Sequence, residues 1–151
     1  MRYLFATLIT AFASPVLAGD IIIEDAYARA SRPGAPTGAI FMKIRNESET
    51  DDHLIGVESN VAKRVELHTH IEDNGVMKMR HVEDGFLLPA GATHELARGG
   101  DHVMLMGVIE ELETGAEIPL TLIFAEAGEI AVMITIDNER GQSGQKSPEN
   151  N

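Results

Sequence analysis

Short runs of β-type residues, each ended by a cluster of turn residues, constrain the fold of this chain more than any other feature. Alternating or apolar runs recur between residues 21 and 137, whereas helical periodicity is hard to find. Gly, Pro, Asn and Asp separate the runs, as at 32–36, 73–75 and 89–91. Many short strands at this spacing predict an all-β fold, an antiparallel sandwich or barrel. We expect strands near 21–30, 38–46, 53–59, 63–70, 76–82, 85–88, 93–97, 102–108, 117–125 and 129–137.

The first 18 residues have the pattern of a secretory signal peptide. Arg2 is followed by an almost entirely apolar stretch over 3–12, and small residues lead up to Ala18. The stretch is shorter than the roughly 20 residues that a membrane-spanning helix needs. We therefore expect cleavage after Ala18 and export to the periplasm, with no membrane insertion of the mature chain.

The segment 139–151 differs in composition from everything before it. It contains no apolar residue that could be buried, and it has no His or Met. We expect a disordered tail there, with no role in metal binding. The folded domain is accordingly predicted to span 19–138, and no linker or internal repeat divides it.

The chain contains no cysteine and is strongly acidic, with 12 Lys and Arg against 24 Asp and Glu and a formal net charge of −12. An acidic chain is unsuited to binding nucleic acid or an anionic membrane surface. The lack of cysteine excludes disulfides, thiolate metal sites and cysteine nucleophiles. An exported domain of this kind must be held together by packing alone.

Most of the His and Met residues fall in two windows, 68–81 and 102–106. The first window is predicted to be a hairpin, because Asp73-Asn74-Gly75 lies between two β-type runs and Asn-Gly tolerates the positive φ of a tight turn. Side chains alternate along each strand, so the His and Met side chains of the hairpin share faces. The residues on these faces are Glu66, His68, His70, Met77, Met79 and His81.

The length of the hairpin loop decides which of these residues are opposed. With a four-residue loop over 72–75, His68 lies opposite Met79, whereas a two-residue loop brings His70 opposite Met79. Directly opposed residues have Cβ atoms about 4.5–5.5 Å apart, so either pair can reach one ion. In the second window His102, Met104 and Met106 share a face, while Val103 and Leu105 can fill the core and leave His102 and Met104 pointing outward.

The donor types indicate copper, with Cu(I) preferred. Thioether sulfur is soft and favours Cu(I), and imidazole binds copper in either oxidation state, so Cu(II) is a second option. The sequence offers no Ser/His/Asp motif, no HExxH motif and no carboxylate cluster, so we do not expect an enzyme. A blue-copper electron carrier is excluded because such sites need a cysteine thiolate.

Each His or Met also has a plainer interpretation. Met42 and Met133 lie in apolar runs and are expected to be core residues. His53 and His94 are expected to be ordinary surface or hydrogen-bonded histidines. His81 is a weaker ligand candidate. Further candidates for supporting roles around the metal are His70, Met77, Met106 and Glu66, the last as an acceptor for an imidazole N–H.

These residues resemble the periplasmic copper chaperone family PCuAC, also named DUF461, over nearly the whole mature chain. The resemblance rests on 65–70, on 75–80, on 88–91 and on 99–106. The family's pattern is a His or Met, ten residues, a Met, a gap of just over twenty, then His-X-Met. It matches His68, Met79, His102 and Met104, and this resemblance selects these four as the metal ligands.

The resemblance also implies a fold and a function. The fold would be a cupredoxin-like Greek-key β-sandwich. The function would be delivery of Cu(I) by ligand exchange to the dinuclear copper site of cytochrome c oxidase, with the oxidase's copper-bearing subunit and Sco-type proteins as partners. A periplasmic copper buffer without a dedicated acceptor would use the same ligands, so the sequence leaves that alternative open.

Overall fold

The computed structural model describes residues 20–140, and in this range the chain forms ten strands and no helix. Within the same range, no helix is long and apolar enough to cross a membrane. The predicted signal peptide 1–18 lies outside the described residues. The strands are β1 Ile21–Ala30, β2 Thr37–Asn46, β3 Asp52–Glu58, β4 Ala62–Asp73, β5 Val76–His81, β6 Phe86–Leu88, β7 Thr93–Leu96, β8 His102–Val108, β9 Glu117–Phe124 and β10 Gly128–Ile136.

Alternation of buried and exposed side chains explains why these segments are strands. In β9, Ile118, Leu120 and Leu122 are buried while the residues between them are more exposed. A segment with this period of two can bury one face only in an extended conformation. The ten expected strands are all present, with ends that agree to within a few residues.

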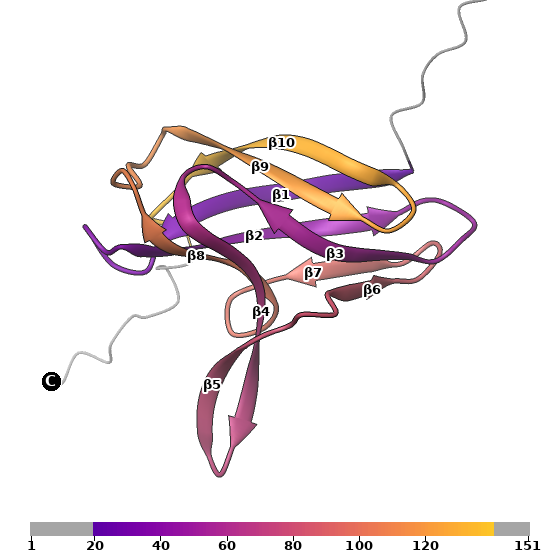
Figure 1. The fold of residues 1–151 in the computed structure, drawn as a ribbon, viewed down its shortest axis with the longest axis horizontal. Helices are drawn as coiled ribbons and strands as arrows, with labels where there is room; N and C mark the ends of the chain where they lie inside the picture. The colour runs from indigo at the N-terminus through magenta and orange to yellow at the C-terminus, as the bar shows by residue number, and fades with distance from the viewer. Residues whose placement is uncertain (1–19, 141–151) are drawn as a thin grey trace, which may run out of the picture.

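One hydrogen-bonded path joins the strands in the order β5-β4-β8-β2-β1-β10-β9-β3-β6, and β7 pairs with β2 beyond the end of β8. The parallel pairing of β1 with β10 connects the two halves of this path, and the other pairings are antiparallel. The halves face each other across one core (Figure 1). The prediction of an all-β sandwich is therefore confirmed.

The core is supplied by both halves. Ile40 and Ile44 of β2 and Leu105 of β8 come from one half, and Leu54 of β3 and Leu122 of β9 come from the other, and all are fully buried. Close packing of β-branched and leucine side chains gives the domain its rigidity without a disulfide. Truncating a side chain such as Leu105 to alanine would cost about 2–5 kcal/mol.

The β4–β5 hairpin projects away from this sandwich (Figure 1). All six residues of β5 are exposed, and β5 is an edge strand of the sheet. β4 reaches Asp73 and is thus longer than the expected strand at 63–70. This extension carries the hairpin beyond the core.

The last described residues return to β1. Asp25 adopts a φ of 55° in a β-bulge of β1, and the Arg140 guanidinium pairs with its carboxylate. The same guanidinium lies 4.2 Å above the Tyr27 ring. The contacts of the domain thus extend to residue 140, two residues past the predicted boundary, and the rest of the predicted tail lies outside the described residues.

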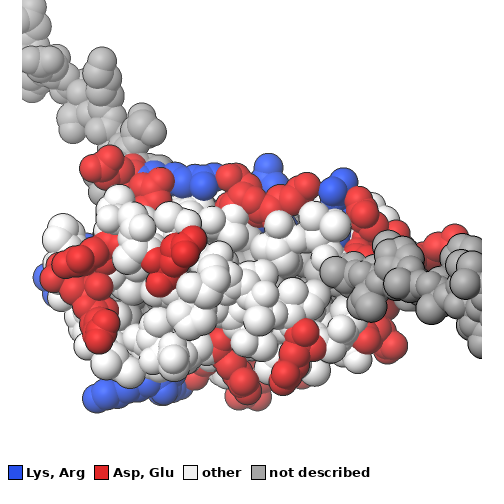
Figure 2. Space-filling view, turned by 90° about the horizontal axis from the view of Figure 1, so that it is seen from above, with Lys and Arg blue, Asp and Glu red and all other residues white. Residues whose placement is uncertain are grey.

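The acidic balance of the chain is visible on the surface. Figure 2 shows the side of the molecule away from the hairpin, where acidic groups, with basic groups among them along the upper edge, surround a largely uncharged face. The hairpin instead carries Lys78 and Arg80 on β5. Glu72 and Asp73 at the end of β4 balance these two charges, and Lys78 pairs with Asp73, so the projecting end of the hairpin is neutral whereas the chain as a whole is acidic.

Candidate metal centre

The turn of the hairpin sets the register of the candidate site. Asn74 and Gly75 form a two-residue loop with φ values of 52° and 80°. This loop pairs His70 with Met79 and His68 with His81. The four-residue loop that would pair His68 with Met79 is therefore wrong, and the two-residue alternative is observed, because β4 keeps its ladder as far as Asp73 and Asn-Gly favours the tight turn.

Strand β8 lies between β4 and β2 and brings the second window to the hairpin. His102 is paired with His68 and Met104 with Glu66 on one side, and Met104 is paired with Ala39 on the other. Val103 and Leu105 fill the core, as expected.

The prediction that His102 and Met104 point outward is only half right. They lie on the face away from the core, but they are only 2% and 9% exposed. An internal strand is covered by side chains of both neighbouring strands, which the sequence of β8 alone does not reveal.

One pocket of about 230 Å³ contains both methionine and histidine side chains. It is lined by His70, Met79, His102 and Met104. Ala39, Phe41, Ser31, Arg98 and Gly99 form the rest of its wall. Three of the four predicted ligands are thus brought together, with His70 rather than His68 as the β4 histidine that lines the pocket.

The histidine rings form a continuous group beside this pocket. The ring centre of His102 lies 5.3 Å from that of His70 and 5.9 Å from that of His68. His68 in turn stacks on His81, with ring centres 5.7 Å apart. His68 therefore does not line the pocket itself, but its ring lies next to that of His102, which does.

A backbone carbonyl holds two of these rings. The Gly100 oxygen accepts a hydrogen bond from His70 Nδ1 and another from His102 Nδ1, each at 3.0 Å. Because a carbonyl can only accept, both Nδ1 atoms carry a hydrogen and both Nε2 lone pairs remain free for a metal. Burial lowers the pKa of His102 below its usual 6.5, so its imidazole is neutral at neutral pH.

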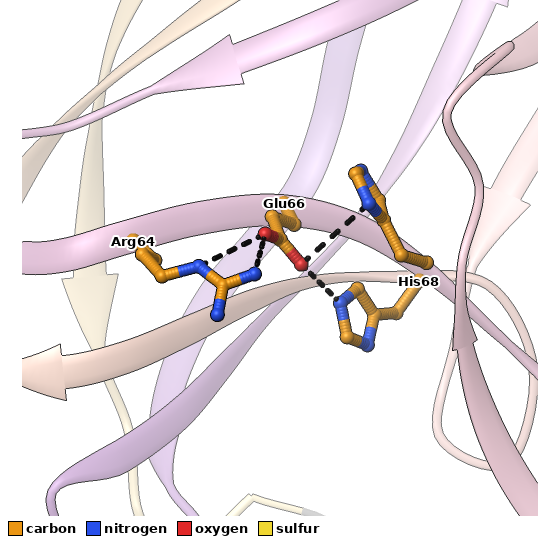
Figure 3. A network of polar contacts seen from close by, with 4 residues as sticks. Arg64, Glu66 and His68 are labelled. Carbon is orange, nitrogen blue, oxygen red and sulfur yellow. Dashed lines mark hydrogen bonds and ion pairs between the residues drawn. The ribbon is translucent and has the colours of Figure 1, made fainter.

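His68 has a different set of partners (Figure 3). Its Nε2 donates to Glu66 Oε2 at 2.9 Å, and Arg64 pairs with the other carboxylate oxygen. His81 Nδ1 lies 3.8 Å from Glu66. The hydrogen bond from His68, together with Arg64, lowers the pKa of Glu66 and keeps it ionised. The predicted role of Glu66 as an imidazole acceptor is thus consistent with this geometry.

The Nδ1 atom of His68 is one of three buried side-chain nitrogens without a hydrogen-bond partner among the described residues, together with Arg45 Nε and His94 Nε2. It is buried and forms no hydrogen bond among residues 20–140. A buried imidazole nitrogen costs free energy unless something satisfies it. A metal ion is such a partner, and a ligating imidazole whose other nitrogen contacts a carboxylate is the common arrangement in metal sites.

Two predicted supporting residues lie outside the pocket. Met77 is 58% exposed and pairs with Glu72 near the tip of the hairpin. Met106 pairs with Arg64 and Thr37, one step along β8 from Met104. Met77 lies on the same face of its strand as Met79, and Met106 on the same face as Met104, as expected. The strand pairing nevertheless places both residues outside the pocket.

The plainer interpretations have mixed outcomes. Met42 is buried in the core as expected, but Met133 is 59% exposed, so the prediction for Met133 is wrong. Met133 alternates with the buried Ile134 and lies on the outer face of β10. His53 contacts the Asp84 carbonyl at 2.6 Å. His94 stacks on Phe86, and its Nε2 lies 2.9 Å from Asp101 Oδ2 without forming a hydrogen bond.

The sequence interpretation missed the groups that complete the pocket wall and orient its rings. Phe41 and Ala39 come from β2, which carries no His, and the Gly100 acceptor is a backbone atom. Gly99-Gly100 is a turn signal before His102, but no residue pattern reveals where a carbonyl points. Within residues 20–140, no three His, Asp or Glu side chains form a metal site by themselves. A metal here would need the methionine sulfurs.

Solved structures similar to this chain include PCuAC domains. A copper-bound PCuAC domain from PmoF2 aligns with a TM-score of 0.65 and 28% identity, covering 80% of this chain and 94% of that one. The solution structure of CuI-DR1885 from Deinococcus radiodurans aligns with a TM-score of 0.61 and 28% identity, covering 78% and 80%. These neighbours confirm the cupredoxin-like fold.

Sequence comparison gives the family. A protein of Leifsonia xyli named "Putative lipoprotein Lxx21020" is 32% identical over 124 residues, which cover 82% of this chain and 74% of that protein. The family described as "Putative lipoprotein LpqE-like" matches residues 21–136, which is nearly the whole described domain. The chain therefore belongs to the LpqE-like family.

Proposed function

We propose that this protein is an exported copper chaperone that carries one Cu(I) ion. The observation that carries the proposal is the convergence of His70, Met79, His102 and Met104 at one pocket, with the His68 ring beside that of His102. Two thioethers beside imidazoles select Cu(I) over Zn, Mg or Ca, because thioether sulfur is a soft, neutral donor. The copper-bound PmoF2 domain and CuI-DR1885 support copper as the cargo.

The proposed ligands are His68, Met79, His102 and Met104. The spacing of the four supports this set, and so does the unpartnered Nδ1 of His68, whose Nε2 is already held by Glu66. His70 lies beside them as a fifth donor, with its Nδ1 on Gly100 and its Nε2 free. Cu(II) would be a weaker cargo, because thioethers add little to its binding.

Delivery by ligand exchange suits the position of Met79. It is 51% exposed on the projecting strand β5, whereas His102 and Met104 are buried. An acceptor can therefore displace the Cu–Sδ bond of Met79 first and form its own bond before the remaining ligands release the ion. A thiolate acceptor drives the exchange, because thiolate binds Cu(I) more strongly than thioether does.

The proposed acceptor is the dinuclear copper site of cytochrome c oxidase, with Sco-type proteins as accompanying partners. The proposed location is the periplasm, after cleavage of the signal peptide. The name of the Leifsonia relative supports export. The role is transport of an ion and involves no catalysed reaction.

An anaerobic Cu(I) titration against a competing chelator tests the site. We expect one equivalent of Cu(I), bound at least about 100-fold more weakly by Met79→Ala and by His102→Ala. His53→Ala is the matched control, because His53 lies outside the pocket and should leave the affinity unchanged. Unchanged affinity in both pocket variants, with their folds intact by circular dichroism, would refute the proposed site.

A transfer assay tests delivery separately from binding. The loaded protein is mixed with an apo fragment of the oxidase's copper-bearing subunit, and the transfer rate is compared with the rate of copper dissociation into chelator. For a chaperone, we expect copper to reach the oxidase fragment faster than it dissociates into the chelator. Transfer no faster than dissociation would leave the alternative function, a periplasmic copper buffer.

A further inference from the structure

Strand β5 is the open edge of the sheet beside the copper pocket. It ends the hydrogen-bonded path, with β4 as its one neighbouring strand within residues 20–140, and all six of its residues are exposed (Figure 1). Val76, Met77 and Met79 are each more than half exposed. An edge with exposed apolar side chains and unpaired backbone groups is a template for a further strand.

The ladder with β4 decides which backbone groups of β5 point outward. Val82 N–H donates to the Leu67 carbonyl at 2.8 Å, and this bond continues the β4–β5 register. In an antiparallel pair, alternate residues direct their N–H and C=O groups to the partner strand, and the residues between them direct theirs to the other side. Met77, Met79 and His81 therefore present their backbone groups outward, with the proposed ligand Met79 at the centre.

A strand added to this edge would place its own side chains beside a copper ligand. Side chains of directly opposed residues lie on the same face of a sheet, with Cβ atoms about 4.5–5.5 Å apart. The residue opposite Met79 would thus share the face on which the Met79 side chain lines the pocket. A soft donor at that position can reach the ion.

Charge decides what kind of strand fits. Lys78 and Arg80 flank Met79 and lie on the other face of β5; Lys78 pairs with Asp73, whereas Arg80 forms no ion pair within the described part of the chain. If β5 of a second copy paired antiparallel with Met79 facing Met79, Lys78 would face Arg80. A shift of two residues in either direction would set Lys78 against Lys78 or Arg80 against Arg80. Like charges directly opposed are destabilising, so a strand with acidic residues at these positions fits and a second copy does not.

We propose that β5 is the docking edge for the copper acceptor, and that it pairs with an extended acceptor segment that has a cysteine opposite Met79 and acidic residues on either side of that cysteine. This docking mode rests on the copper chaperone function proposed above. The cysteine releases its proton to solvent, its thiolate forms a bond to Cu(I), and the Cu–Sδ bond of Met79 breaks. The ion stays Cu(I) throughout, and the stronger thiolate bond drives the exchange.

Amide hydrogen exchange in the copper-free protein tests the pairing itself. The probe is the reduced synthetic peptide acetyl-Thr-Val-Glu-Cys-Glu-Val-Thr-amide, and its control has Lys in place of both Glu residues. We expect the acidic peptide to slow exchange of the Met77, Met79 and His81 amides several-fold, because it accepts their hydrogen bonds. The Lys78 and Arg80 amides already bond to β4 and should change little. Unchanged exchange at all three outward amides would overturn the docking edge.

The rate of Cu(I) transfer to the same acidic peptide tests the backbone contribution. Met77→Pro removes one outward N–H, and proline is tolerated where the N–H of an edge strand faces solvent. Met77→Ala is the matched control, because it removes the same side chain and keeps the N–H. Met77 lies outside the pocket, so both variants should bind Cu(I) as the wild type does in chelator competition. We expect transfer from Met77→Pro to be about 2–10-fold slower than from Met77→Ala, the loss expected for one hydrogen bond, and equal rates would count against strand pairing.

Charge reversal tests the chemistry of the partner without a proline. Arg80→Glu should slow transfer to the acidic peptide about tenfold and speed transfer to the Lys peptide, because charges at the rim of a contact act mainly on the association rate. Arg80 is exposed and outside the pocket, so Cu(I) affinity should not change. Equal rates to the two peptides, in the wild type and in Arg80→Glu alike, would overturn the acidic partner.

The docking edge and the copper function fail in different ways. A wild-type protein that binds no Cu(I) would overturn the copper function, and amide exchange in the copper-free protein would still test the pairing. A wild-type protein that binds Cu(I), but shows neither slowed exchange nor a difference between Met77→Pro and Met77→Ala, would overturn the docking edge while the copper site stands.

Discussion

His70 of β4 and Met79 of β5 lie directly opposite each other in the hairpin, and both line the pocket that contains His102 and Met104. At this pocket, side chains of the exposed edge strand β5 therefore lie near side chains of the buried strand β8. Copper held here would be bound partly by groups fixed in the sandwich and partly by the hairpin that projects from it. The hairpin is therefore both a part of the site and its accessible side.

The two β4 histidines can be ranked by substitution. We expect His68→Ala to weaken Cu(I) binding by about 100-fold or more, as for loss of a ligand, and His70→Ala by about 10-fold or less. The physical reason is the free, buried Nδ1 of His68 and its Glu66 partner. Chelator competition measures both affinities, and the reverse order would assign the fourth ligand to His70.

Methionine oxidation should follow exposure in the copper-free protein. Peroxide is expected to convert Met77 and Met79 to sulfoxides before Met42 and Met104, because the first two are about half exposed and the others are buried. Mass spectrometry of peptides during a time course measures the order.

A redox-inert ion turns the same experiment into a test of the site. Ag(I), used in place of Cu(I), should protect Met79 from peroxide and leave Met77 unprotected, because only Met79 lines the pocket. Met77 on the same strand is the internal control. Equal oxidation rates for the two methionines in the silver-loaded protein would argue against Met79 as a ligand.

The hairpin turn should influence copper binding through register. Gly75 has a φ of 80°, a conformation that costs an L-residue about 1–2 kcal/mol. Gly75→Ala should therefore destabilise the hairpin and weaken Cu(I) binding, with a small effect on the unfolding of the sandwich. Asn74→Gly, which tolerates the same φ, is the matched control, and equal affinities in the two variants would contradict this prediction.

The Asp25–Arg140 pair predicts a specific response to acid. The hydrogen bond from Arg140 lowers the pKa of Asp25 below its usual 3.8. Stability from this pair is therefore fully present above pH 3.8 and is lost as the pH falls through the lowered pKa of the folded protein. Asp25→Asn should remove this part of the acid dependence, measured as unfolding midpoint against pH, and the effect is small because the pair is exposed. An identical acid dependence in the variant would show that the pair contributes nothing.

The strands could be predicted well because alternation is a local property. The pattern of Ile118, Leu120 and Leu122 is visible in the sequence and reappears as one buried face of β9. Met133 shows where such reasoning fails. It lies in a run that is apolar on both faces, and composition cannot say which face of β10 meets the core.

The sequence by itself determined the donor types, the faces that carry them and the Asn-Gly turn that permits a two-residue loop. These depend on residue identity and on the two-residue period of a strand. Tertiary structure decided that His70 rather than His68 opposes Met79, that His102 is buried, and that Gly100 serves two rings. The reason is that register, burial and the direction of a carbonyl depend on neighbouring strands and on contacts between residues far apart in the sequence, such as that of the His70 ring with the Gly100 carbonyl.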